Sequence, residues 1–201
     1  MRPFATVWSA LVPAATSYLL LTVAAAVFAV IVRSRRFTVV PALFVSIVDA
    51  VLLYSLFLVT YLVAAPQPAM SGGAVRLVPG TDLGVALQAA PGDLLPWLQL
   101  VGNLLLLAPF GALIPVRTSW FGSWSRISLG AIAVTCGIEL LQYTVLTGRV
   151  VSADDVLLNA TGAVLGALVS RPWWGRLPQT LTAARPRPRH ALQPQYARSG
   201  A

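Results

Sequence analysis

The segment PAATSYLLLTVAAAVFAVIV, from Pro13 to Val32, decides the class of fold because its twenty residues carry no charge. An α-helix of about 20 apolar residues is long enough to cross the hydrocarbon core of a bilayer. The arginine-rich cluster 33–36 follows it, where a secretory signal peptide would have small residues at a cleavage site. We therefore interpret the segment as a retained membrane span.

The composition of the whole chain agrees with a membrane protein. Of its 201 residues, 57% are hydrophobic and 10% are charged, whereas a soluble domain carries about 25% charged residues. The length leaves room for spans and short loops but for no large soluble domain. The chain has a single cysteine, Cys136, so it cannot form an intrachain disulfide or a thiolate metal cluster. Its single histidine, His190, lies in the Pro/Arg-rich tail, so the sequence does not predict a histidine-based catalytic triad. We expect no metal and no cofactor.

Four further segments have the length and apolarity of membrane helices. They run from about Val39 to Ala65, Trp97 to Val116, Ile127 to Leu146 and Val156 to Val169. The last is short, but it can extend into residues 170–174. The sequence therefore predicts an all-α fold, a polytopic integral membrane bundle of about five transmembrane helices.

The arginines predict the orientation of this bundle. All 14 basic residues are arginine, and eleven of them fall on the side of the cluster 33–36. These are Arg33, Arg35, Arg36, Arg117, Arg126, Arg171, Arg176, Arg185, Arg187, Arg189 and Arg198. Because cytoplasmic loops are enriched in basic residues, we predict the N-terminus outside and the C-terminus in the cytoplasm. The basic Pro/Arg-rich tail 171–201 is expected to be disordered and to meet anionic lipid headgroups, not nucleic acid.

Two carboxylates are expected inside spans, where an ionisable group costs about 2.5–3.5 kcal/mol unless it is paired or hydrated. Glu139 shares a helix face with Gln142 and lies about 10 Å below the outer end of its span, so it should point into the bundle. Arg149, in the short loop that follows, could pair with Glu139 or with Asp155. Asp49 lies in an apolar stretch and is either protonated or paired with an arginine, and the spacing does not identify that partner.

The fifth span carries a stripe of polar and small residues on one face. Asp155, Asn159, Gly162 and Gly166 are spaced four, three and four residues apart. The glycines allow close helix packing, which would hold the polar half of the stripe against a neighbour near the outer surface. One of the two adjacent aspartates should cap this helix, and we assign Asp154 to the cap and Asp155 to the site.

The third span contains the run NLLLLAPFG, from Asn103 to Gly111. Pro109 frees a backbone carbonyl and is expected to bend the helix, and Gly111 relieves crowding beside the bend. Asn103 is either part of a polar site or the one satisfied asparagine of a kinked packing helix.

These polar positions together resemble the signature of the VanZ-like family of bacterial membrane proteins. The resemblance covers about Val75 to Val169. Relatives usually carry an Asn-Leu-x-Pro-Phe type segment ahead of the third span; here Val75-Arg-Leu-Val-Pro79-Gly80 keeps the proline but lacks the asparagine and the phenylalanine. We divide the chain into a two-span region 1–74 without a family motif, a VanZ-like membrane domain 75–170 and the tail 171–201.

The resemblance implies a multi-pass protein of the bacterial plasma membrane, in a family named for a protein associated with glycopeptide (teicoplanin) resistance. The polar constellation that it implies is Asn103, Glu139, Gln142, Arg149, Asp155 and Asn159. The residues that we assign to helix packing are Pro109, Gly111, Gly162 and Gly166. Membership in the VanZ-like family would suggest a role in antibiotic resistance or envelope homeostasis.

Three kinds of function fit this constellation. In the first, which we favour, the protein binds a polar headgroup, a lipid-linked envelope precursor or a glycopeptide-type antibiotic at the outer leaflet, with Arg149 as the anion contact. In the second, a membrane enzyme uses Glu139 or Asp155 as an acid or base on a lipid-linked substrate, although no nucleophile with an adjacent base is visible. In the third, an ion network fixes the helices and function lies in a partner.

Overall fold

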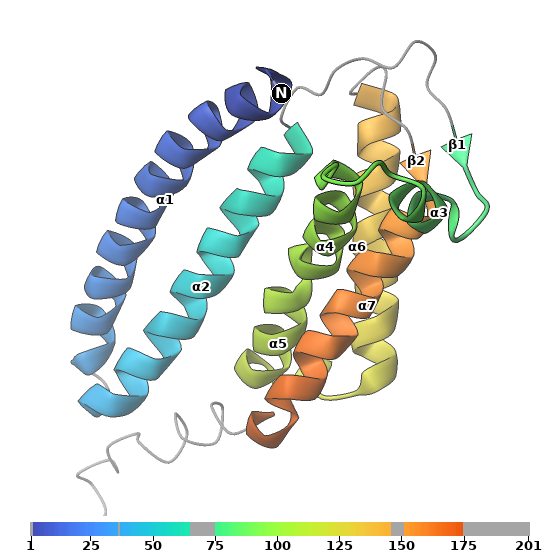
Figure 1. The fold of residues 1–201 in the computed structure, drawn as a ribbon. Coiled ribbons are helices and arrows are strands. Elements are labelled where there is room, and N and C mark those ends of the chain that lie inside the picture. Colours follow the sequence, from blue (N-terminus) through green and yellow to red (C-terminus); the bar gives the residue numbers. More distant parts are fainter. Residues whose placement is uncertain (1, 36, 65–74, 146–150, 175–201) are drawn as a thin grey trace, which may run out of the picture.

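The computed structural model describes residues 2–35, 37–64, 75–145 and 151–174, and most of them are helical. Five helical segments are long and apolar enough to cross a membrane. Four are single helices, namely α1 (Arg2–Ser34), α2 (Val39–Ala64), α6 (Trp124–Val145) and α7 (Ala153–Ser170). The fifth is divided into α4 (Leu95–Leu106) and α5 (Ala108–Arg117). The predicted all-α bundle of five spans is therefore confirmed (Figure 1).

Short elements that the sequence did not predict join these spans. They are β1 (Val75–Arg76), α3 (Thr81–Leu87), the 3-10 turn η1 (Ser119–Phe121) and β2 (Val151–Ser152). The 3-10 turn η2 (Arg171–Trp173) extends the fifth span beyond α7, as the sequence allowed. The two strands pair in parallel, with Val75 opposite Val151 and Arg76 opposite Ser152. This pairing brings the segment after α2 to the start of α7, near α3 (Figure 1). The tail beyond residue 174 lies outside the described residues.

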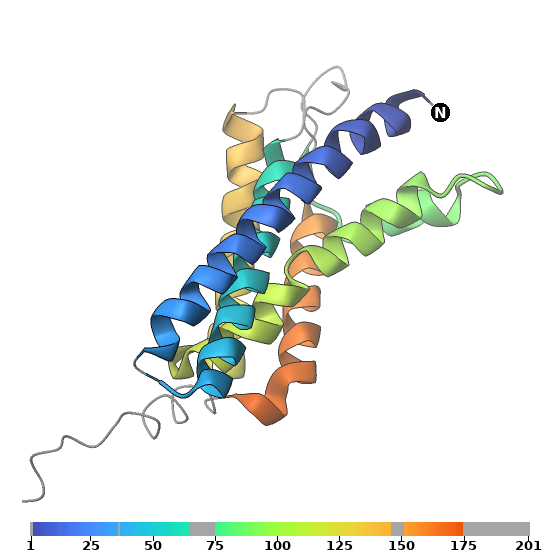
Figure 2. The same ribbon diagram turned by 90° about the vertical axis from the view of Figure 1, so that its left-hand side faces the viewer.

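The third span breaks at Leu107, two residues before Pro109. Proline has no N–H, so the carbonyl of Leu105 loses the helical hydrogen bond that residue 109 would otherwise donate. The chain resumes as α5, and the N–H of Gly111 donates to the Leu107 carbonyl at 3.0 Å. Figure 2 shows α4 inclined to α7 above this break. The bend expected from Pro109 is therefore present.

Helix α7 packs against α4, α5 and α6 and forms the centre of the four-helix part of the molecule. A Cβ atom placed on Gly162 would lie 1.7 Å from the carbonyl oxygen of Leu104, and one on Gly166 would lie 2.1 Å from that of Ala108. From the opposite side, a Cβ on Gly111 would lie 1.8 Å from the Ala163 carbonyl oxygen. The three glycines thus let the backbones of α4, α5 and α7 approach more closely than side chains would allow.

Helices α1 and α2 form a hairpin beside this four-helix part (Figure 1). The rings of Tyr18 and Phe57 stack between the two helices with centroids 4.6 Å apart. The principal contact of the hairpin with the rest of the described chain is α2 against α5, where Val45, Val48 and Val116 form a buried cluster.

The two ends of the bundle differ in their charges. One end, which we call the arginine end, includes the described residues Arg33, Arg35, Arg117, Arg126 and Arg171. The other, which we call the strand end, includes β1, α3, β2 and the start of α7. Because the arginines gather on one side, the predicted orientation would place the arginine end in the cytoplasm and the strand end outside.

Candidate functional site

At the strand end, Asp154 caps the start of α3. Its Oδ1 accepts a hydrogen bond from the N–H of Gly80 at 2.6 Å, and its Oδ2 accepts one from the N–H of Asp82 at 2.7 Å. Gly80 has a φ of 87°, a left-handed conformation that glycine adopts without a steric penalty. A carboxylate on α7 therefore satisfies the free N–H groups of a helix that lies more than seventy residues earlier in the chain.

The assignment of Asp154 as the cap of its own helix is wrong. The N-cap of α7 is Ser152, whose Oγ accepts a hydrogen bond from the N–H of Asp154 at 3.2 Å. A serine two residues ahead of the helix interior is itself a good N-cap, so the local signal was present in the Ser152-Ala-Asp154 sequence. The carboxylate of Asp154 is thereby left available to α3.

Asp82 extends this assembly to the strands. Its Oδ1 pairs with Nη1 of Arg76 at 3.0 Å, and its Oδ2 accepts a hydrogen bond from Ser152 Oγ at 2.5 Å. The side chains of Arg76, Asp82 and Ser152 therefore join β1, α3 and β2. No local pattern in the sequence around Arg76 or Asp82 indicates that their segments meet.

The residue that follows Asp154 on α7, Asp155, contacts α4. Asn103 donates from Nδ2 to Oδ1 of Asp155, which brings together two members of the predicted constellation. Asn159, four residues after Asp155, is 4% exposed, and its Oδ1 is buried without a hydrogen-bond partner in the described part of the chain. The α4–α7 interface thus holds one paired carboxylate and one amide oxygen with unused accepting capacity.

The remaining predicted residues belong to α6 and to the segment after it. Glu139 and Gln142 are 7% and 9% exposed, so both are buried although they lie on a membrane-spanning helix. Arg149, the predicted anion contact, lies outside the described residues. A buried carboxylate on a membrane-spanning helix is stable only with polar or cationic partners. The surroundings of Glu139 are therefore a candidate binding position.

An open groove of about 560 Å³ passes Glu139 at the strand end. Its lining comes from the segment 75–79, α6 and the start of α7. The lining residues are Val75, Leu77, Pro79, Cys136, Glu139, Leu140, Tyr143, Ser152, Ala153, Val156 and Leu157. Most of these are apolar, and Glu139 is the one carboxylate among them. The groove therefore combines an apolar surface at membrane depth with one acidic group and two hydroxyl groups.

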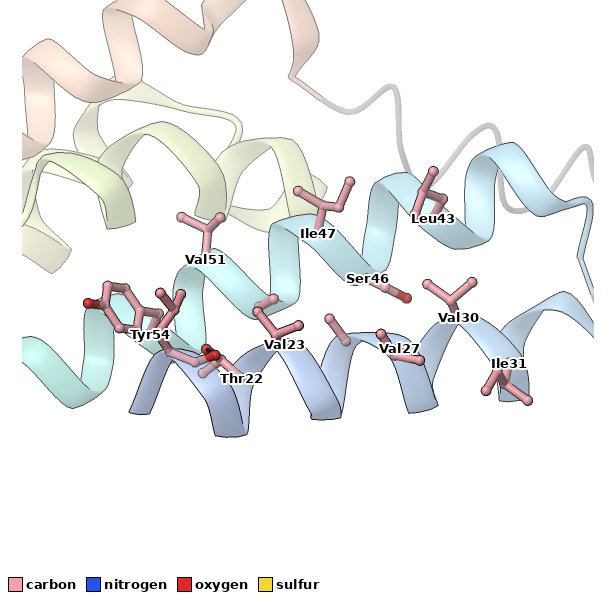
Figure 3. A pocket seen from close by; sticks show the side chains of 13 residues that line it. Thr22, Val23, Val27, Val30, Ile31, Leu43, Ser46, Ile47, Val51 and Tyr54 are labelled. Atoms are coloured by element: carbon pink, nitrogen blue, oxygen red, sulfur yellow. Dashed lines mark hydrogen bonds between the residues drawn. The ribbon is translucent and has the colours of Figure 1, made fainter. Parts of the chain in front are cut away.

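A second groove, of about 450 Å³, lies between α1 and α2 (Figure 3). The side chains that line it are aliphatic except for Thr22, Ser46 and Tyr54, and none is a carboxylate or a guanidinium. It resembles the first groove in size but lacks a charged group in its lining.

Asp49 has two arginine partners, and both lie at the arginine end. Its Oδ2 lies 2.6 Å from Nη2 of Arg33, and its Oδ1 lies 2.7 Å from Nε of Arg117. Of the two alternatives for Asp49, pairing with an arginine is therefore the one that the structure shows. Its partners belong to α1 and α5, so no spacing within α2 could identify them.

The family model described as VanZ/LLP1 matches residues 47–174. The match begins within α2, upstream of residue 75 from which the sequence resemblance was traced, and it includes α3 to α7. No curated protein and no solved structure matches the chain. Because the family model covers more than half of the chain, the protein belongs to the VanZ/LLP1 family.

Proposed function

We propose that this VanZ/LLP1 family member binds an amphiphile at the outer leaflet of a bacterial plasma membrane, with the polar headgroup beside Glu139 and an apolar chain in the groove at the strand end. The amphiphile would be a lipid, a lipid-linked envelope precursor or a glycopeptide-type antibiotic. A role in antibiotic resistance or envelope homeostasis would follow from such binding. The outer location rests on the arginine distribution.

The observation that carries this proposal is the position of Glu139 in the lining of an apolar groove. The groove is open, and its lining includes exposed leucines such as Leu140 and Leu157, at 63% and 52% exposure. On a membrane-spanning helix these side chains face hydrocarbon, so a ligand chain can reach the groove from the bilayer. Glu139 then offers an acceptor to hydroxyl, amide or amine groups of the headgroup.

The neighbouring polar groups divide into supporting and binding roles. Asp154, Asp82 and Ser152 are engaged in hydrogen bonds that fix α3 and the strands, so they support the rim of the groove. Asn159 has an unused amide oxygen that a ligand donor could reach if the headgroup enters between α4 and α7. Arg149 supplies the one cation that the sequence predicts here for a phosphate or carboxylate.

The experiment compares two adjacent leucines of α6. Leu140 lines the groove and Leu141 does not, yet both are exposed, at 63% and 50%. We expect Leu140→Trp to reduce the lipid that co-purifies with the protein, because the larger ring fills the groove. Leu141→Trp should leave it unchanged. Native mass spectrometry of the detergent-purified protein measures the bound species.

Two further variants test the polar half of the proposal. Arg149→Gln and Glu139→Gln should each lower the amount of bound amphiphile and change susceptibility to glycopeptides in cells that depend on the protein. The proposal fails if Leu140→Trp and both polar variants retain the wild-type set of bound lipids. It also fails if Leu141→Trp removes them as effectively as Leu140→Trp.

The structural alternative also has a specific observation in its favour, namely the contact between Asn103 and Asp155, which joins α4 to α7. If Glu139 and Arg149 serve only to hold helices together, the double reversal Glu139→Arg with Arg149→Glu should restore the wild-type susceptibility to glycopeptides that the single variants lose. If they contact a ligand, function should stay lost while the protein remains folded. Folding is monitored by thermal unfolding in detergent.

A further inference from the structure

The arginine end carries a charged cluster that the proposed function does not use. Asp49 is shared by Arg33 and Arg117, so one carboxylate faces two guanidinium groups and the triad has a net charge of +1. The exposed fractions of the three side chains are 27% for Arg33, 32% for Asp49 and 38% for Arg117. The triad is therefore partly open to its surroundings and has excess positive charge.

The hydrogen bonds of the triad leave donors unused. Arg33 donates from Nη2 to Asp49 and from Nη1 to Ser46 Oγ at 2.9 Å. Arg117 donates from Nε to Asp49, and its two Nη groups make no hydrogen bond within the described part of the chain. Guanidinium groups with free N–H groups bind the oxygens of phosphate or carboxylate in a forked arrangement. The unused donors and the charge both favour an anion.

The surroundings add to this preference. Arg126 and Arg171 lie at the same end, each over a tryptophan ring, at 5.3 Å from Trp120 and 4.7 Å from Trp174. Asp49 is the one carboxylate at this end within the described residues. Tryptophan and arginine together are typical of the interface between lipid headgroups and acyl chains.

The groove between α1 and α2 begins at this cluster. Ser46, the hydrogen-bond partner of Arg33, lines it (Figure 3). Its lining on α1 extends from Ile31 to Leu19, which is about 18 Å at the helical rise of 1.5 Å per residue. One leaflet of a hydrocarbon core that is about 30 Å thick measures about 15 Å. The groove therefore has the length of an acyl chain that reaches from a headgroup to the middle of the bilayer.

We propose that the Arg33–Asp49–Arg117 triad and the α1–α2 groove form a binding site for one anionic phospholipid. The phosphate contacts the free Nη groups of Arg117 and the open side of Arg33. One acyl chain lies along the aliphatic groove from Ser46 toward Tyr54. The site is separate from the strand-end groove, and its leaflet is the one at the arginine end.

The first test uses the full chain in nanodiscs that contain equal amounts of phosphatidylglycerol and phosphatidylcholine with identical acyl chains. Native mass spectrometry after release into detergent should show phosphatidylglycerol enriched on the wild type. Arg117→Gln should lower that enrichment about fivefold, from a loss of about 1 kcal/mol per arginine near a charged surface. Arg126→Gln, at the same end but with its Nη1 bonded to the Trp120 carbonyl, is the matched control and should lower the enrichment less than Arg117→Gln does.

Two variants separate lipid binding from a merely structural triad. Asp49→Asn raises the net charge of the triad from +1 to +2, so it should increase the enrichment of phosphatidylglycerol. Its thermal stability should fall in phosphatidylcholine and recover in phosphatidylglycerol. Ala26→Phe fills the groove without a change of charge and should reduce binding of the phospholipid. In a separate comparison, inorganic phosphate alone should stabilise the wild type less than phosphatidylglycerol does.

Several outcomes would overturn this site. They are equal retention of both lipids by the wild type, the same loss of enrichment in Arg126→Gln as in Arg117→Gln, and an Asp49→Asn protein that is equally unstable in both lipids. If Ala26→Phe keeps the full enrichment, or inorganic phosphate stabilises the wild type as much as the phospholipid, the groove has no role and the site as proposed is wrong.

Discussion

At the scale of single residues, Asp154 shows how a side chain can stabilise an element far away in the chain. It is 6% exposed and accepts two hydrogen bonds from backbone N–H groups at the start of α3. We expect Asp154→Ala to lower the free energy of unfolding by about 1–3 kcal/mol, because N–H groups of α3 lose a charged acceptor. Thermal unfolding in detergent measures the loss.

Asp93 offers a comparison for that variant. It is exposed and accepts one local hydrogen bond, from the N–H of Leu95 at 3.2 Å. Asp93→Ala should therefore cost less stability than Asp154→Ala. Equal losses in the two variants would show that the contact between α7 and α3 contributes nothing beyond an ordinary surface carboxylate.

Asn159 gives a prediction of the opposite sign. A buried amide oxygen without a partner costs free energy, so Asn159→Leu, which keeps the number and branching of the side-chain heavy atoms, should keep or raise the melting temperature. If the amide oxygen accepts a hydrogen bond from a bound headgroup, the same variant should retain less amphiphile. A fall in melting temperature together with unchanged lipid binding would contradict both parts.

The sequence predicts where a residue lies along its helix, but not which residues of other helices it contacts. Periodicity placed Glu139 inside the fourth span and Asp155 and Asn159 near the start of the fifth, because a residue's position along a helix follows from counting. It could not pair Asp49 with Arg33 and Arg117, or Asp154 with Gly80, because each of these contacts depends on which helices are neighbours. Hydrophobic patterns locate spans along the chain but do not order them around a bundle.

At the scale of elements, the glycines of α7 set the distance to α4 and α5. Gly162→Ala should destabilise the protein by about 3 kcal/mol or more, because its Cβ would lie 1.7 Å from a backbone oxygen that cannot move alone. Gly137→Ala on α6 has no atom within 4 Å of the added Cβ and should be neutral or stabilising by up to about 1 kcal/mol. Chemical or thermal unfolding in detergent distinguishes the two.

The five spans were predictable because each is a long apolar run, and the structure moves most of their limits by only a few residues. Helix α6, for example, begins at Trp124 where the sequence suggested Ile127. The exception is the start of α1, which begins at Arg2 and contains Pro13 in its interior. The elements β1, β2 and α3 were missed for a physical reason. Strands of two residues have no periodicity, and the seven-residue α3 gains its cap from α7, so no local pattern could indicate it.

At the scale of the whole molecule, the orientation in the membrane can be tested with single cysteines. In a Cys136→Ser background, Ser123→Cys lies between η1 and α6 at the arginine end and should react with a membrane-impermeant maleimide only from the cytoplasm. Asp93→Cys, ahead of α4, should react from outside. Labelling of the two cysteines from the opposite sides would show that the bundle has the inverse orientation. The proposed amphiphile site would then lie in the inner leaflet.

The central position of α7 has a consequence for biogenesis. Helices α4, α5 and α6 precede α7 in the chain, and each packs against it. Until the ribosome has delivered α7, Asn103 lacks its Asp155 partner and Gly111 lacks the backbone that it faces. The earlier spans must therefore wait in the translocon or in lipid in an incomplete arrangement. A nascent chain halted before residue 151 should be a preferred target of membrane proteases, and release of the halt should restore its resistance.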